Sequence, residues 1–171
     1  CSDDPLFVEL VEALHELNPS ANSAYYLGLL NDKKGDTKLA IQYYNESIDL
    51  ESDKLKKAKT LYKIAVKFKK SGQFSKSRTY ANKALGFQPS MGRAYLLIAN
   101  LYASSANNCG KTQFEKRSIY WLALKEAKKA GSVDASVRKL AKKTALSYEG
   151  RAPSKTDIFS EAMSGKTISF K

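Results

Sequence analysis

Few residues in this sequence combine the type and the spacing that catalysis requires. Residues 164–167 read Ser-Gly-Lys-Thr, which could end a phosphate-binding loop, but Ser160 stands where such a loop needs a glycine. His15 is the only histidine, and no cysteine or second imidazole lies near it in sequence, so the pattern argues against a metal site or a histidine-based catalytic pair. Cys109 has no basic or imidazole sequence neighbour that would lower the pKa of its thiol. We therefore predict a non-catalytic protein with no cofactor and no metal site.

The first residues of the chain do not determine the cellular compartment of the protein. The first residue is Cys1 rather than methionine, and it suits the lipidated start of an exported bacterial lipoprotein. An excised boundary explains it equally well, and we favour that explanation. Both an exported or envelope protein and a cytoplasmic one stay open, as does a disulfide between Cys1 and Cys109. The most apolar stretch, residues 94–103, is about half of the roughly 20 residues that a membrane span needs, so no span is predicted.

Charge is distributed unevenly along the chain. The 171 residues include 29 Lys and Arg and 17 Asp and Glu, which gives a formal net charge of +12. Residues 1–52 carry a net −7, whereas residues 53–171 carry a net +19. An acidic partner is therefore expected to meet the second part of the chain, and the first part should repel it.

Apolar residues recur three and four positions apart through most of the chain, as in residues 61–68, and this period indicates helices. Gly35 and Gly72 can each end a helix in the left-handed conformation, and Asp36 can cap the next helix. Pro19 and Pro89 separate successive helix pairs. We predict an all-α fold of seven to nine antiparallel helices, each of roughly 12 to 16 residues.

These breaks and packing residues also repeat. A series of small and large side chains recurs at a shift of 37 residues, from Leu27-Gly28, Gly35, Ala40, Tyr44 and Ser47 to Ile64-Ala65, Gly72, Ser77, Ala81 and Ala84. A third copy begins at Tyr95, Ile98, Ala99 and Tyr102 and resumes after an inserted loop at Tyr120, Leu124 and Ala127. The order of these residues resembles the tetratricopeptide repeat (TPR), as found in TPR modules of uncharacterised bacterial proteins.

The resemblance implies a right-handed TPR superhelix, an α-solenoid of about three helix-turn-helix repeats with flanking helices. We place the solenoid at residues 1–150, with repeats at about 21–54, 58–91 and 92–133 and a capping helix at 134–149. Three extra residues are expected to lengthen the link before the second repeat, and about nine to lengthen the hairpin of the third. Residues 151–171 are expected to form an extension with a short helix, which Ser154 and Asp157 would cap, and a strand at Thr167–Phe170.

In TPR proteins the first helix of each repeat lines a concave face that holds the ligand. By resemblance, the ligand-groove candidates are Asn22, Tyr25, Leu29 and Lys33 in the first copy, Lys59, Tyr62, Val66, Lys69 and Lys70 in the second, and Arg93, Leu96 and Asn100 in the third. Their mixture of tyrosine, aliphatic and basic side chains suits an extended peptide with acidic groups. The alternative is that these are ordinary solvated positions on helices.

Three functions remain open at this stage. The first is a protein-protein interaction module or scaffold that binds a peptide segment or a neighbouring domain in its groove. The second is binding of nucleic acid or another polyanion through the basic residues 53–171. A binding affinity that falls steeply as the salt concentration rises would reveal this function. The third is charge-driven self-association into a homo-oligomer, because the acidic first part and the basic second part carry unlike charges.

Overall fold

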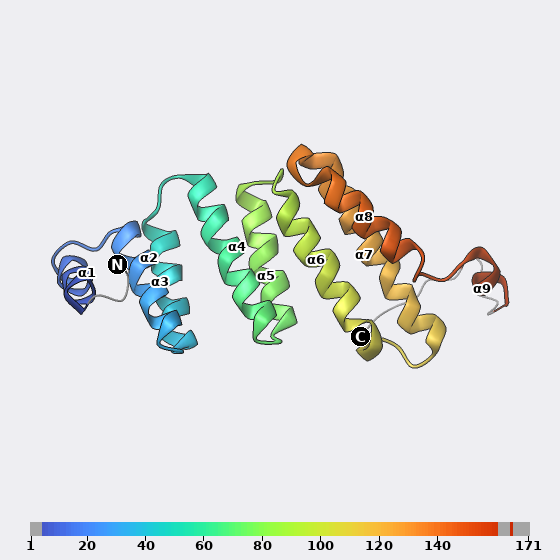
Figure 1. The fold of residues 1–171 in the computed structure, drawn as a ribbon, viewed down its shortest axis with the longest axis horizontal. Helices are drawn as coiled ribbons and strands as arrows, with labels where there is room; N and C mark the ends of the chain where they lie inside the picture. The colour runs from blue at the N-terminus through green and yellow to red at the C-terminus, as the bar shows by residue number, and fades with distance from the viewer. Residues whose placement is uncertain (1–4, 161–164, 166–171) are drawn as a thin grey trace.

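The computed structural model describes residues 5–160 and residue 165, and this part of the chain is all-α. Helices α2 to α8 lie side by side in one elongated row, with α1, seen end-on, at one end and α9 beyond the other (Figure 1). Their bounds are α1 Pro5–Leu17, α2 Ala21–Lys33, α3 Thr37–Leu50, α4 Lys54–Lys70, α5 Phe74–Phe87, α6 Gly92–Ser105, α7 Gln113–Val133, α8 Arg138–Glu149 and α9 Lys155–Ser160. Two short 3-10 helices, η1 (Ala106–Asn108) and η2 (Ala135–Val137), precede α7 and α8.

The expected all-α solenoid is confirmed, because the described residues contain no strand and consecutive helices pack in pairs. Within these residues α2 packs with α3, α4 with α5 and α6 with α7, and α8 packs against α7. The seams between pairs, α3 with α4 and α5 with α6, are looser. Helix α7, with 21 residues, is longer than the sequence predicted, whereas α9, with 6, is the short helix expected in the extension.

The helix ends follow the chemistry that the sequence predicted. Gly35 and Gly72 have φ angles of +84° and +74°, which place them in the left-handed region where glycine is favoured. A carboxylate oxygen of Asp36 accepts the backbone N–H of Leu39 at 3.0 Å and so caps α3. Each of the two glycines therefore turns the chain back on itself at the bend of a helix pair.

The core consists of small residues on one helix facing large ones on another. Ala65, Ala81 and Ser77 are fully buried, and the Oγ of Ser77 donates to the backbone oxygen of Ala65 at 2.7 Å. The large rings of Tyr44 and Phe68 fill the space opposite small residues. This arrangement explains the fixed order of the repeat, since a large residue at a small position would separate the paired helices.

The link between the first and second repeats differs from the prediction. Only residues 51–53 separate α3 from α4, and the extra residues extend α4 instead of the link. Asp53 causes this early start, because its carboxylate accepts the backbone N–H groups of Leu55 (2.7 Å) and Lys56 (3.2 Å). The longer hairpin of the third repeat, in contrast, lies where it was expected, between α6 and α7.

The carboxyl extension is attached to α7. Ser154 and Asp157 cap α9 as predicted, with the Asp157 carboxylate accepting the Ser154 N–H at 2.7 Å and the Ser154 hydroxyl accepting the Asp157 N–H at 3.2 Å. Arg117 of α7 donates to the backbone oxygen of Ala152 at 3.0 Å and pairs with Asp157 at 3.3 Å. The expected strand at Thr167–Phe170 lies outside the described residues, as does Cys1.

Candidate functional site

Helix α4 carries core residues on one side and candidate groove residues on its flank. Leu61, Ile64 and Phe68 are buried in the core. Tyr62, Val66 and Lys69 follow one another at spacings of four and three residues, which stacks them along a single face of the helix, and each is half-buried. This face lines a space that α4 shares with α6 and α8.

Helix α6 supplies Arg93, Leu96 and Asn100, again at helical spacing. Its start is fixed to the segment before α8, because a carboxylate oxygen of Asp134 accepts the Gly92 N–H at 3.2 Å. The other carboxylate oxygen of Asp134 accepts the hydroxyl of Ser136 at 2.6 Å and its N–H at 2.9 Å. These hydrogen bonds, that of the Ser136 hydroxyl above all, lower the pKa of Asp134. Asp134 therefore positions η2 beside the first turn of α6.

Together these elements line an open hollow of about 620 Å³, which we call the central hollow. Its lining consists of Tyr62, Val66 and Lys69 from α4, Arg93, Leu96, Leu97 and Asn100 from α6, and Ser136, Val137 and Leu140 from η2 and α8. Six of the twelve groove candidates, Tyr62, Val66, Lys69, Arg93, Leu96 and Asn100, thus line one space. A volume of this size falls within the range of typical ligand pockets.

The chemistry of the central hollow is apolar with positive charge. Lys69 and Arg93 supply two cations, and its described lining includes no acidic side chain. Burial raises the pKa of Tyr62, although the nearby Arg93 acts in the opposite direction, so the phenol keeps its proton and can donate a hydrogen bond. The hollow is therefore lined by aliphatic side chains, the hydroxyls of Tyr62 and Ser136, one amide and two cations.

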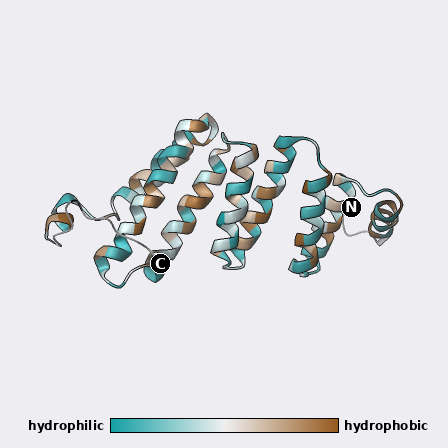
Figure 2. Ribbon diagram, turned by 180° about the vertical axis from the view of Figure 1, so that it is seen from behind, coloured by the Kyte–Doolittle hydropathy of each residue, from teal (hydrophilic) through white to brown (hydrophobic). Residues whose placement is uncertain are grey.

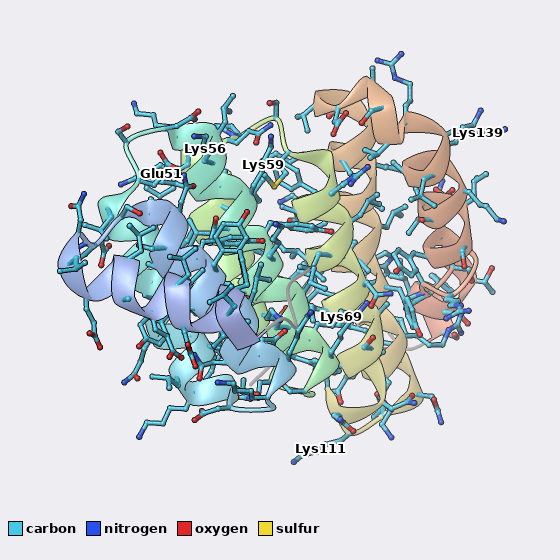
Figure 3. All side chains as sticks on the ribbon, turned by 60° about the vertical axis from the view of Figure 1, so that its left-hand side comes forward. Glu51, Lys56, Lys59, Lys69, Lys111 and Lys139 are labelled. Carbon is cyan, nitrogen blue, oxygen red and sulfur yellow. The ribbon has the colours of Figure 1, made fainter. Side chains whose placement is uncertain are left out.

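Two second-copy candidates lie outside this space. Lys59 and Lys70 are exposed and do not contribute to the lining. Figure 3 labels Lys59, Lys69 and Lys139, and it shows Lys139 pointing away from the molecule on the outer side of α8. Since Lys69 and Lys70 are adjacent, the rotation of about 100° per residue along a helix puts only one of them in the hollow.

The first-copy candidates also lie elsewhere. Asn22 is exposed on α2, whereas Leu29 and Lys33 line a separate pocket of about 190 Å³ between α1 and α2. Tyr25 packs its ring 5.6 Å from the ring of Tyr44. The sequence grouped these four residues with the rest, but the structure does not bring them into the central hollow.

Cations from α4 cover the concave side of α2. The ammonium of Lys63 donates to the hydroxyl of Tyr25 and lies 4.6 Å from the centre of its ring. The ammonium of Lys67 forms an ion pair with Asp32 of α2. Tyr25 and Asp32 therefore interact with α4, across the seam between the first two helix pairs.

Sequence reasoning missed the contribution of η2 and α8 to the hollow. Leu140 shares the apolar period of the last helix with Val137 and Ala141, so its position predicts core. It is instead 57% exposed and lines the central hollow. The apolar face of this helix includes one residue more than the buried stripe requires, and this was the available signal. The sequence of a single helix does not reveal which edge of its apolar face another element covers.

The remaining candidates for chemistry have structural surroundings. His15 is only 12% exposed, since its Nδ1 lies 2.9 Å from the Ser23 hydroxyl and its Nε2 lies 3.2 Å from a Glu46 carboxylate oxygen. It therefore joins α1 to α2 and α3. Cys109 is a free thiol at the edge of a pocket that also contains Arg78, a neighbour that the sequence order did not reveal.

Among residues 5–160 and residue 165, no group of three or more histidine, cysteine, aspartate or glutamate side chains is arranged to hold a metal ion. None of their helices has the length and apolar character needed to traverse a bilayer.

Comparison with known proteins agrees with the repeat pattern. A tetratricopeptide-repeat family model matches residues 21–54, which cover α2, α3 and the first residue of α4. Photosystem I assembly protein Ycf3 of Prochlorococcus marinus subsp. pastoris is 30% identical over 105 residues, and the match spans 58% of this chain and 61% of that relative. The Ycf3 protein of Prochlorococcus marinus strain MIT 9301 is 26% identical over 125 residues, with 69% of this chain and 72% of the relative covered.

The matched segment, the helix pairs and the repeated packing residues agree with one another. The family model falls on the first of the helix pairs, and the same order of small and large residues recurs 37 positions later in the second, except that Ala81 stands at the position of Tyr44. The relatives found come from cyanobacteria, in agreement with the bacterial resemblance. Residues 21–54 therefore match a tetratricopeptide repeat, and the paired helices that follow give the described part of this chain the fold of a helical-repeat solenoid.

Proposed function

We propose that this chain is a non-catalytic interaction module that holds an extended, acidic peptide segment of a protein partner in the central hollow. The observation that carries the proposal is the lining itself, which combines aliphatic side chains with Lys69 and Arg93 and includes no described acidic residue. Apolar contacts would supply affinity, and the two cations would select carboxylates. Tyr62, whose phenol stays protonated, would donate to a backbone or carboxylate oxygen.

The relatives suggest the setting in which such a module acts. Their name assigns them to the assembly of photosystem I. We take from this only the general role, and propose that the chain is a scaffold that brings protein partners together. A neighbouring domain of a longer chain would satisfy the same chemistry as a separate partner, provided that it presents an acidic extended segment.

Peptide selection tests whether the central hollow binds acidic peptides. Short peptides are selected from a display library on the wild-type protein, and their affinity is measured by fluorescence anisotropy. We expect acidic residues to be enriched, and we expect Tyr62→Ala combined with Lys69→Glu to weaken binding by at least about tenfold, the equivalent of about 1.4 kcal/mol.

Lys70→Glu is the matched control for Lys69→Glu. Both substitutions change the charge by the same amount at adjacent residues of α4, but only Lys69 lines the hollow. We expect Lys70→Glu to leave most of the affinity intact. If both substitutions reduced the affinity equally, binding would depend on the overall charge of the protein, and the proposal that the central hollow holds the peptide would be abandoned.

The polyanion alternative stays a prediction from the net +19 of residues 53–171. Several aromatic faces that single-stranded nucleic acid would stack on already meet cations of this chain, such as Tyr95 below Lys129 at 4.8 Å and Tyr80 beside Lys83 at 5.1 Å. We therefore favour the peptide. Tight binding of a mixed-sequence oligonucleotide that weakens steeply with salt would reverse this preference.

A further inference from the structure

The end of α6, the connection from α6 to α7 and the start of α5 lie at the same edge of the row (Figure 1). These segments line a pocket of about 320 Å³, which we call the edge pocket. It shares no lining residue with the central hollow. Its volume lies at the lower end of the range of small-molecule sites, so it suits a compact ligand.

The connection from α6 to α7 forms one wall of the edge pocket through Cys109. Hydrogen bonds on both sides of Cys109 fix this wall. The backbone N–H of Cys109 donates at 3.3 Å to the oxygen of Ala106, which is 3% exposed. Further along the chain, a Glu115 carboxylate oxygen accepts the backbone N–H groups of Lys111 (2.5 Å) and Thr112 (3.1 Å). The wall is therefore preformed.

The inner surface of the edge pocket is apolar. Leu101 is 3% exposed, and Phe74 and Tyr102, both half-buried, pack against the same hydrophobic cluster. Figure 2 shows hydrophobic colour along α6, the helix that supplies Leu101 and Tyr102. Two aromatic rings and a leucine favour a ligand with an apolar body, because its burial removes apolar surface from water.

The outer part of the edge pocket is polar and positively charged. Arg78 of α5 is exposed, and its guanidinium carbon lies 5.4 Å from the centre of the Tyr102 ring. No carboxylate among the described residues forms an ion pair with Arg78. Ser75 adds a hydroxyl that can donate a hydrogen bond. The mouth of the pocket therefore offers donors and one cation to an anionic group.

Acidic residues that could neutralise Arg78 are scarce in this part of the chain. The sequence contains no Asp or Glu between Asp53 and Glu115, so neither α5 nor α6 carries one. Glu115 is engaged with the backbone ahead of α7, and the described lining of the pocket includes no acidic side chain. An anion in the edge pocket would therefore meet a guanidinium group without a competing carboxylate.

We propose that the edge pocket binds a small monocarboxylate with an apolar body. The carboxylate accepts hydrogen bonds from Arg78 at the mouth of the pocket, and the apolar body packs on Phe74, Leu101 and Tyr102. One cation matches a single negative charge better than the charge of about −1.5 to −2 on a phosphate monoester. The site is separate from the central hollow and adds a small-molecule ligand to the proposed peptide.

Alkylation of Cys109 tests the occupancy of the edge pocket, because this thiol is part of its lining. The full chain with Cys1→Ser has no other cysteine, and N-ethylmaleimide is a neutral reagent that the charge of Arg78 does not attract. The rate of alkylation is followed by mass spectrometry, with 3-phenylpropionate as the probe ligand. If its dissociation constant is about 1 mM, a concentration of about 10 mM should slow the reaction about tenfold by mass action.

Two analogues separate the parts of the probe ligand. 3-Phenylpropionamide keeps the apolar body but has no charge, and propionate keeps the carboxylate but has no ring. We expect each of them to protect Cys109 much less than 3-phenylpropionate does at the same concentration and ionic strength, because each makes only one of the two kinds of contact.

Arg78→Gln should remove most of the protection by 3-phenylpropionate, measured relative to the alkylation rate of the same variant without ligand. Lys76→Gln is the matched control. It removes the same charge two residues earlier on α5, from an exposed side chain that does not line the pocket, and it should keep the protection. Circular dichroism verifies that both variants keep their helices.

Three results would overturn the proposal. The first is an alkylation rate that 3-phenylpropionate does not change, and the second is equal protection by the neutral amide, which would mean that the carboxylate is not recognised. The third is an Arg78→Gln variant that is protected as well as Lys76→Gln. Tyr62→Ala with Lys69→Glu should leave the protection unchanged, so failure of peptide binding and failure of the edge pocket are distinguishable.

Discussion

The same substitution at two glycines should have opposite effects on stability. Gly28 lies inside α2 and Gly86 in the last turn of α5. Alanine is favoured over glycine in a helix by roughly 0.5 to 1 kcal/mol, and both variants gain some part of this. At Gly86 an added Cβ would meet no atom within 4 Å, so we expect Gly86→Ala to be neutral or to stabilise the protein.

At Gly28 the added Cβ would lie 2.6 Å from Cδ1 and 2.7 Å from Cε1 of Tyr44. Tyr44 is 1% exposed, so its ring has little room to move away. Forcing an extra carbon into a packed core costs typically about 1 to 3 kcal/mol. We therefore expect Gly28→Ala to be less stable than Gly86→Ala by about that amount, because the helix preference is similar in both and largely cancels.

Urea unfolding followed by circular dichroism measures the two free energies of unfolding. The slope with denaturant should stay unchanged, so that the midpoints report stability alone. Combining Gly28→Ala with Tyr44→Leu should recover part of the loss, because the smaller side chain leaves room for the new Cβ. If Gly28→Ala were as stable as Gly86→Ala, the close approach of α2 to the Tyr44 ring would not be the reason for glycine at this position.

Three further substitutions test the packing and the hydrogen bonds that hold the solenoid together. Ser77→Ala removes a buried hydroxyl that donates to the Ala65 oxygen, and it should cost about 0.5 to 1.5 kcal/mol in urea unfolding. Tyr44→Phe should leave stability unchanged or raise it, since the buried Tyr44 hydroxyl has no hydrogen-bond partner among the described residues. Asp134→Asn should destabilise the protein at neutral pH. The pKa of Asp134 in the folded protein is below its ordinary value, so its carboxylate stabilises the fold above the ordinary pKa, and this effect is lost as the pH falls towards the folded-state pKa. The free energies of unfolding of the wild-type and Asp134→Asn proteins should therefore become equal in acid.

Local physics explains why so much of the fold was predictable. Turn glycines, caps such as Asp36 and the 3.6-residue apolar period act over a few residues, so the sequence shows them directly. The 37-residue recurrence of small residues such as Ala65 and Ser77 then specified how helices pair, because only small residues permit the close approach. The link before α4 was mispredicted because the spacing of the repeats shows only that extra residues are present, whereas capping by Asp53 makes those residues helical.

The candidate site was predictable only in part. The resemblance to the tetratricopeptide repeat selected Tyr62, Val66 and Lys69 as groove candidates, and the structure brings them to the same hollow as Arg93, Leu96 and Asn100. The covering of Tyr25 by Lys63 was not foreseen, because it joins residues 38 positions apart in sequence.

By itself, the sequence determined the all-α repeat architecture, the positions of the turns and the unequal charges of the two parts of the chain. Only the tertiary structure decided which of the groove candidates line one space, and that η2 and α8 form one side of the central hollow. The physical reason is range. Helix period and capping depend on neighbours along the chain, whereas a hollow depends on how separate helices stack, and on which side chains reach across the seams between them.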